Sequence, residues 1–228
     1  LGRFDVAPVF RSPAFFVGVG IGFLNAGGSL WYADEFYGNV IYPVTRVMIE
    51  TLGGSFTFIP LIVAIYYAGE LVWRDRERRV HEIVDASPAP DWAFVIPKVV
   101  AISLVLLATI AASVLASLLV QFFKGYANVE IGKYLAWYVA PWTVDIILIA
   151  ILAVFIQALV PHKFVGWLVM LVFIVAQIVA ARLGYEHNLY QYATSPPVPL
   201  SDMNGSGRFL EYSAWLRAYW SAFAVLLV

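Results

Sequence analysis

Residues 69–92 read GELVWRDRERRVHEIVDASPAPDW and form the most strongly charged stretch of the chain. Apolar runs too long for a soluble core flank this charged stretch on both sides. Within it, four apolar residues recur at helical spacing and make one stripe: Trp73, Val80, Ile83 and Val84. The Ser-Pro-Ala-Pro sequence that follows ends a helix, because proline lacks a backbone donor and pushes its predecessor out of the helical region. We therefore predict an amphipathic helix over about residues 73–86, lying at a membrane surface between two spanning helices.

The composition is that of a membrane protein. Hydrophobic residues make up 62% of the 228 residues and charged residues 13%, against roughly 45–50% and about 25% in a soluble domain. The sequence thus predicts an all-α, polytopic helical bundle in a lipid bilayer. The formal net charge of −1 gives no indication of a nucleic-acid partner. Cysteine is absent, which excludes disulfides and thiolate metal sites.

Six apolar runs are predicted to span the membrane as one domain covering residues 1–228, at about residues 14–30, 56–72, 97–120, 141–160, 164–183 and 212–228. The last run is still in progress at Val228, so we expect a truncated sixth span and a fragment of a longer protein. Residues 31–54 are predicted to form a loop with interfacial tyrosines. Residues 184–211 are rich in Pro, Ser, Gly and Asn and predict a long irregular loop.

Rows of small residues predict close contacts between spans. In the first span they recur every four residues, at Gly18, Gly22 and Ala26. The third span carries two such rows: Ala108, Ala112, Ala116 and Thr109, Ser113, Ser117. We interpret both as helix–helix faces and not as ligand sites.

The distribution of basic residues predicts the orientation. If the charged stretch is cytoplasmic, eight of the fourteen Lys and Arg residues share its side, including those of the N-terminus and of the 161–163 turn. The other six then lie opposite: Arg46, Lys124, Lys133, Arg182, Arg208 and Arg217. The density of charge close to two spans favours this choice. We expect a multi-pass protein of the plasma (inner) membrane with residues 73–91 cytoplasmic and the 184–211 loop outside.

The charged stretch also points to a family. Arg76-Glu77-Arg78, followed by Glu82-Ile83-Val84, Ala86-Ser87-Pro88 and then Lys98, resembles the hallmark of type-2 ABC exporter permeases. The sequence departs from that hallmark at Arg79 and Val80, where the family usually has Gly and Thr. With this departure, and with GELVWR at 69–74 and HEI at 81–83, it is most similar to a subgroup in which permease halves are fused to a large zinc aminopeptidase domain.

This resemblance implies a permease with six spans and a cytoplasmic coupling helix. A partner nucleotide-binding protein would hydrolyse ATP, and a second permease half or a second copy would complete the transporter. The residues expected to contact the nucleotide-binding protein are Trp73, Arg74, Arg76, Glu77, Arg78, Arg79, Glu82 and Ile83. The chain has no Gly-x-x-x-x-Gly-Lys-Ser/Thr phosphate loop. We therefore expect no cofactor and no enzyme activity in this fragment, and zinc only if a peptidase domain is attached.

Two other functions were weighed against transport. The spans could be a membrane anchor for the fused aminopeptidase, whose catalytic domain would lie outside this fragment. An ion-coupled secondary transporter is disfavoured, because that mechanism usually needs several ionisable groups at mid-membrane and broken helices there.

The chain contains no convincing catalytic or metal site. The sequence HEIVD at 81–85 begins like the zinc-protease motif His-Glu-x-x-His, but Asp85 replaces the second histidine, so the two-imidazole face does not form. An intramembrane aspartyl protease would need a second carboxylate facing Asp145, and the spans offer none.

Four polar residues within the spans are candidates for a transport pathway: Asp145, Asn25, Gln157 and Gln177. Asp145 is the carboxylate inside a span and is a functional candidate for that reason. It follows Pro141 by only four residues, which favours a position at the interface or at a pore mouth. For the three amides, hydrogen bonding between helices is the commoner role.

Overall fold

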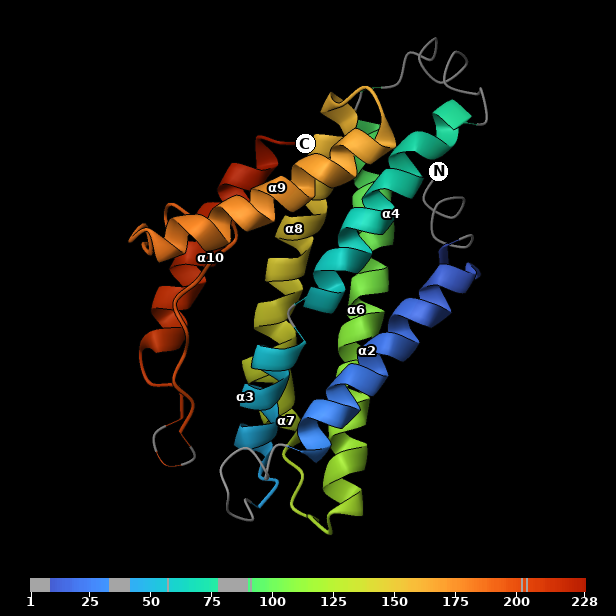
Figure 1. The fold of residues 1–228 in the computed structure, drawn as a ribbon. Helices are drawn as coiled ribbons and strands as arrows, with labels where there is room; N and C mark the ends of the chain where they lie inside the picture. Colours follow the sequence, from blue (N-terminus) through green and yellow to red (C-terminus); the bar gives the residue numbers. More distant parts are fainter. Residues whose placement is uncertain are drawn as a thin grey trace.

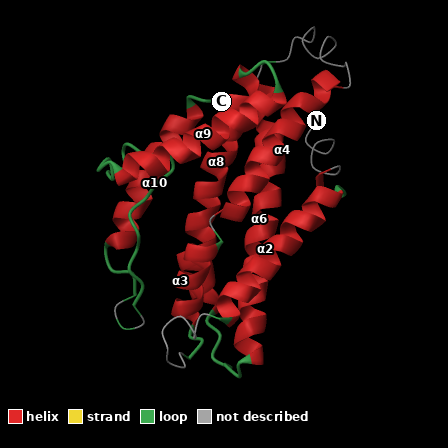
Figure 2. Cartoon of the chain, in the orientation of Figure 1, coloured by secondary structure: helices red, strands yellow, loops and turns green. Residues whose placement is uncertain are grey.

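The chain folds into helices and connecting loops (Figure 2). The structure is a computed structural model that describes residues 9–32, 42–56, 58–77, 90, 92–201, 203 and 205–228. Within these ranges it contains no β-strand, and only Ser201 and Gly205 form an isolated bridge. The predicted all-α class is therefore confirmed.

The described helices follow one another up and down along the bundle (Figure 1). Their bounds are α2 Pro13–Trp31, α3 Thr45–Ser55, α4 Phe58–Glu77, α6 Trp92–Phe123, α7 Ile131–Lys133, the π-helix η2 Tyr134–Val139, α8 Ala140–Leu159, α9 Lys163–Arg182 and α10 Phe209–Val225. The end of α4, the start of α6 and the α8–α9 turn lie at one end of the bundle, and the α6–α7 loop lies at the other (Figure 1).

Helix α6 is the centre of the fold. It packs against α2, α4 and α8, and these helices supply most of the main hydrophobic core. Its own fully buried side chains include Ile102, Leu106 and Ile110. Helix α9 contacts α4 and α8 and runs obliquely across the outside of the bundle (Figure 1), and only Gly166 and Met170 of α9 are buried. Helix α10 packs on α8.

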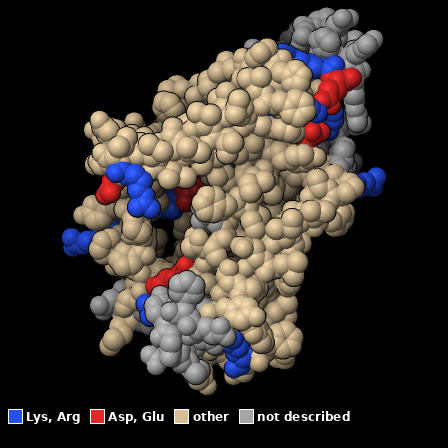
Figure 3. Space-filling model, viewed as in Figure 1, with Lys and Arg blue, Asp and Glu red and all other residues tan. Residues whose placement is uncertain are grey.

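Several of these helices are compatible with a membrane-embedded, multi-pass protein. Among the described residues, four helical segments are long and apolar enough to cross a membrane, or five if the bent pair α3–α4 counts as one span. These segments are α2, α6, the run from α7 to α8, and α9. Helix α10 has 17 residues and is not among them. Broad uncharged surfaces separate the patches of charged side chains (Figure 3), as lipid contact requires.

Gly22, Ser113 and Ser117 of the small-residue rows lie at helix contacts, as predicted. A Cβ atom on Gly22 would stand 3.1 Å from the Phe56 ring, so glycine sets the approach of α2 to α3 and α4. In the third predicted span, Ser113 and Ser117 bond the hydroxyls of Tyr138 and Tyr134 at 3.0 and 2.6 Å. These buried bonds fasten η2 to α6, because an unpaired hydroxyl there would be costly.

Several boundaries predicted from the sequence are wrong. Helix α6 begins at Trp92 and not at residue 97, and α10 ends at Val225, although the last span was expected to continue through residue 228. Residues 45–55, expected as part of a loop, form α3, because Met48, Ile49 and Leu52 bury one face of that helix. The span expected to end at residue 72 continues in α4 to Glu77. No proline or glycine follows Gly69 within α4, so nothing stops the helix where the apolar run ends.

The fourth predicted span begins earlier than expected. It forms part of one helical run over Ile131–Leu159, 29 residues long. The π-helix lies directly before Pro141, and the backbone N–H of Ala140 bonds the carbonyl of Leu135. Proline lacks an N–H and cannot make the usual helical bond. The wider π-turn at this point lets the helix continue through the proline.

Candidate functional site

The described part of the predicted coupling segment is the last turn of α4. Trp73, Arg74, Arg76 and Glu77 lie on it, so residues 73–77 extend α4 and do not begin a separate helix. The remaining candidates lie outside the described residues: Arg78, Arg79, Glu82 and Ile83, as does the rest of the predicted helix to residue 86.

Lys163, the first residue of α9, pairs with two carboxylates of α4. Its Nζ lies 2.5 Å from Glu77 Oε1 and 3.5 Å from Glu70 Oε1. Glu70 and Glu77 are separated by two helical turns, so they share the face of α4 that meets the α8–α9 turn. The lysine thus spans the contact between the two elements.

Trp73 makes the second connection from the same face. Its indole Nε1–H donates to Gln157 Oε1 of α8 at 3.0 Å, and the Gln157 amide donates to the backbone carbonyl of Lys163 at 3.4 Å. Gln157 is 1% exposed. Gln157 belongs to α8, and its buried carboxamide bonds both α4 and the start of α9. This one side chain therefore connects three helices. We name the group Glu70, Trp73, Glu77, Gln157 and Lys163 the α4–α9 clasp.

Two glycines leave the space in which the clasp forms. A Cβ atom on Gly166 would stand 2.3 Å from Gln157 Oε1, and one on Gly69 would stand 2.2 Å from Trp167 Nε1. Real Cβ atoms do not approach so closely, so any larger residue would push the carboxamide or the indole aside. The close packing of α9 on α4 and α8 thus depends on glycine at both positions.

The hydrogen bonds of the buried Gln157 amide are expected to stabilise the clasp more than the ion pairs do. The side chains of Lys163, Glu70 and Glu77 are 20%, 37% and 51% exposed, and pairs this exposed contribute about 0–1 kcal/mol. An unsatisfied buried amide costs about 1–3 kcal/mol. We infer that Gln157 fixes the geometry and that Lys163 adds charge complementarity.

Val9 and Ser12 lie beside the same end of α4. Ser12 Oγ, the cap of α2, is 2.8 Å from the Tyr67 hydroxyl. A cavity of about 250 Å³ lies between these residues and the charged turn, lined in part by Glu70, Arg74 and Glu77. Arg76 stacks its guanidinium 4.8 Å from the centre of the Trp73 ring. Among the described residues, Arg74, Arg76 and Lys163 thus lie at this end of the bundle.

A second polar group lies within the bundle, between α8 and α10. Arg217 Nε and Nη2 donate to the two carboxylate oxygens of Asp145 at 2.8 and 2.9 Å, and Nη1 donates to Ser213 Oγ. The Arg217 and Asp145 side chains are only 15% and 21% exposed. This bidentate geometry is the strongest hydrogen-bonding arrangement between a carboxylate and a guanidinium.

The structure corrects the positions predicted for both partners. Asp145 is the fifteenth of the 29 residues of the helical run and lies at its middle, not near its start, because the helix begins ten residues before Pro141. Arg217 was assigned to the side opposite the charged stretch, yet it lies in the middle of α10 and bonds Asp145. The sequence did contain a signal for this pair: Arg217 lies inside a predicted span, and a charged side chain there normally has a partner.

The ion pair borders a cavity of about 440 Å³ that is also lined by Trp137, Trp142 and Glu50. No second carboxylate was predicted to face Asp145. Glu50 approaches the same cavity because residues 45–55 are helical, but it pairs with Arg46 at 3.3 Å. Each carboxylate thus has its own arginine, unlike the two carboxyls of an aspartyl protease, which share one proton.

The other two pathway candidates lie apart from Asp145. Asn25 of α2 donates to the backbone carbonyl of Ser55 at 3.0 Å, so it bonds across helices. Gln177 of α9 lines a different cavity, between α4, α8 and α9. The four candidates are therefore not brought together in one site. Within the described ranges, no group of three or more His, Asp or Glu side chains could hold a metal ion.

The clasp predicts a coupled effect of Trp73 and Gln157 on stability. Trp73→Phe leaves the Gln157 oxygen unsatisfied, and Gln157→Leu leaves the indole N–H unsatisfied, so each should lower the free energy of unfolding by about 1–3 kcal/mol. The double variant should lose clearly less than the sum, as measured by SDS-induced unfolding in mixed micelles. Trp215→Phe, at a 70% exposed position, is the control and should be nearly neutral. Additive losses would contradict the clasp.

The Asp145–Arg217 pair predicts a different pattern. Arg217→Gln leaves an uncompensated charge among apolar side chains and should cost on the order of 3 kcal/mol. The neutral double variant Asp145→Asn/Arg217→Gln should recover much of this loss in the same unfolding assay. Arg208→Gln removes an exposed arginine just before α10 and serves as the control. If the single and double variants were equally unstable, the pair would not be the stabilising contact.

The chain was also compared with known proteins. No protein-family model, no curated protein and no solved structure matches it.

Proposed function

We propose that this chain is a permease unit of an ABC exporter, in which residues 73–86 receive the motion of a nucleotide-binding protein. The proposal combines the sequence resemblance of the charged stretch with one structural observation, the α4–α9 clasp. The clasp joins the last two turns of α4 to the α8–α9 turn. A push on the charged stretch would therefore displace α4, α8 and α9 together.

The physical basis of this proposal is the stiffness of the connection. Helix α4 continues without a break from the apolar core to Glu77, so its charged end cannot turn independently of its buried part. Gln157 and Gly166 hold α8 and α9 against the same helix. Rigid elements of this kind transmit a displacement at one end of a bundle to its interior, which is how domain motions are coupled.

Such a motion would act on the Asp145–Arg217 pair. It joins α8, which the clasp holds, to α10, which packs on α8. A shift of α8 relative to α10 would strain the pair and change the cavity beside it.

In this proposal the six predicted spans lie in the plasma membrane with the charged stretch cytoplasmic. A second permease half or a second copy completes the pathway, and ATP is bound by the partner protein.

The proposal predicts a cross-link between the charged stretch and the nucleotide-binding protein. Single cysteines at Arg76 and Glu82 are suitable because the native chain has none, and Glu77 is left in place because it holds Lys163. In membranes that contain both proteins, oxidation should link either position to a cysteine in the helical face of the partner. The yield should change when ATP is added.

Ala127, exposed in the loop at the opposite end of the bundle, is the control position and should give no cross-link. If neither Arg76→Cys nor Glu82→Cys cross-links while the full-length protein still cleaves peptides, the permease function is refuted. The spans would then be an anchor for an aminopeptidase domain.

A further inference from the structure

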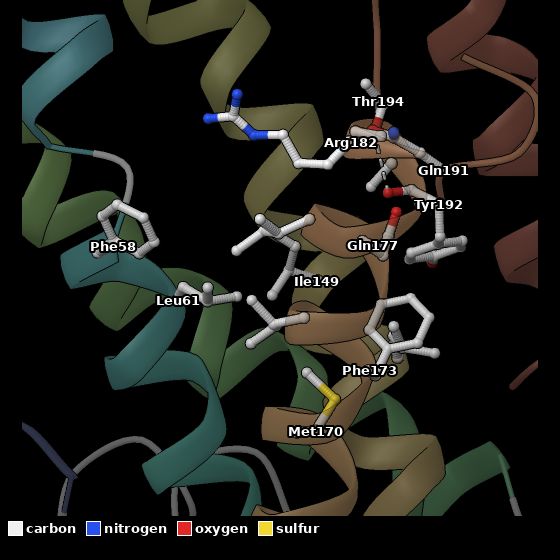
Figure 4. Close-up of a pocket in the computed structure, with 15 residues that line it drawn as sticks. Phe58, Leu61, Ile149, Met170, Phe173, Gln177, Arg182, Gln191, Tyr192 and Thr194 are labelled. Atoms are coloured by element: carbon white, nitrogen blue, oxygen red, sulfur yellow. Dashed lines mark hydrogen bonds between the residues drawn. The ribbon is translucent and has the colours of Figure 1, made fainter. Parts of the chain in front are cut away.

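A cavity of about 440 Å³ lies between the first turns of α4, the middle of α8, the second half of α9 and residues 191–194 (Figure 4). It is separate from the cavity beside Asp145 and is not used in the proposed coupling. Its volume falls within the range of small-ligand sites, roughly 300–1,000 Å³.

Most of the wall is apolar and comes from three helices. The apolar lining includes Phe58, Leu61, Ile149, Leu152, Met170 and Phe173. Two further observations show that the cavity opens on the apolar flank of the bundle: Phe58 and Ile178 both line it and are 59% and 50% exposed. A molecule could therefore enter from the surrounding hydrocarbon without crossing water.

One end of the cavity is polar. Figure 4 shows Arg182 extending over the end opposite Met170, with Gln177, Gln191 and Thr194 on the same side. Gln191 donates to the carbonyl of Tyr185, and Thr194 donates to that of Tyr192. Among the described residues, Arg182 has no ion pair and the Gln177 amide has no hydrogen bond, and none of the described lining residues is acidic.

The loop that closes this polar end is held in place. The Tyr192 hydroxyl donates to the carbonyl of Leu148 at 3.0 Å, and its ring packs 5.3 Å from the centre of the Trp220 ring. Burial raises the pKa of Tyr192 to about 12, so the hydroxyl stays a neutral donor at physiological pH. The polar end is thus fixed to α8 and α10.

An apolar cavity with a single positive group at one end matches an amphiphile with a negative head group. Water would gain few partners along the apolar wall, and a small polar solute would leave that wall uncovered. A guanidinium prefers phosphate, which it can bind through two donors at once. The amide of Gln177 offers a further donor beside it.

We propose that this cavity binds one acyl chain of an anionic membrane phospholipid, with the head-group phosphate on Arg182 and Gln177. The acyl chain covers the apolar wall, and the charged head group remains at the polar end. This site requires only that the chain lies in a membrane, so it stands independently of the permease function.

The test is native mass spectrometry of the whole chain released from nanodiscs. The nanodiscs contain equal amounts of phosphatidylglycerol and phosphatidylcholine with identical acyl chains. We expect one retained lipid per chain, with phosphatidylglycerol in excess. Arg182→Gln should lower that excess roughly fivefold, the effect of one basic residue on an anionic lipid. Arg182→Lys should keep most of it, and the exposed control Arg208→Gln should keep all of it.

A second variant tests the apolar part of the site. Ile174→Trp adds volume to the lining and should abolish retention of either lipid, with circular dichroism and thermal unfolding used to confirm that the variant is folded. Equal retention of the two lipids by the native chain would overturn the proposal. So would an unchanged excess in Arg182→Gln, or unchanged retention in a folded Ile174→Trp variant.

Discussion

The hydrogen bond between Trp73 and Gln157 is the contact on which the organisation of one end of the bundle depends. In an apolar environment a carboxamide must find partners within the protein, and Gln157 finds them on α4 and at the start of α9. Gly166 leaves room for it. Three helices are therefore held at one point, and the charged turn of α4 projects directly from that point.

Other polar side chains within the bundle also bond to a partner on a second helix. Tyr134 and Tyr138 bond to the serine row of α6, and Asp145 bonds to Arg217. Each of these polar groups joins two helices, and the apolar surfaces between the helices supply most of the burial. Helix α9 is an exception, because beyond the clasp it leaves most of its apolar surface exposed and borders the cavity at Arg182.

The sequence predicted the helices and their contacts better than their ends. The apolar runs and the small residues at Gly22 and Ser117 identified spans and contact faces, because both depend on local composition. Residues 45–55 were missed, since nearby interfacial tyrosines suggested a loop. The apolar face of this helix is a single narrow stripe that includes Met48, Ile49 and Leu52. Pro141 was expected to start a helix, and the π-turn before it could not be seen from residue types alone.

The candidate site was predicted only in part. Trp73 and Glu77 were identified from the charged stretch, but their partners Gln157 and Lys163 lie more than 80 residues away, and no local pattern joins them. Asp145 was identified from its charge and placed by its distance from Pro141, whereas Arg217 was placed by the distribution of basic residues, so the two were not paired. Pairing of distant side chains depends on how the helices pack, which a single sequence does not contain.

The central claim is that the end of α4 and the α8–α9 turn move as one unit. Pulsed electron–electron resonance distances between spin labels test it directly in the cysteine-free chain. Labels at Arg76, His162 and Ala127 are taken in pairs, in the presence of the proposed nucleotide-binding partner. The account predicts that the distance from 76 to 162 stays constant when ATP is added, while the distances from both to 127 change. A change between 76 and 162, or no response of any distance to ATP, would contradict it.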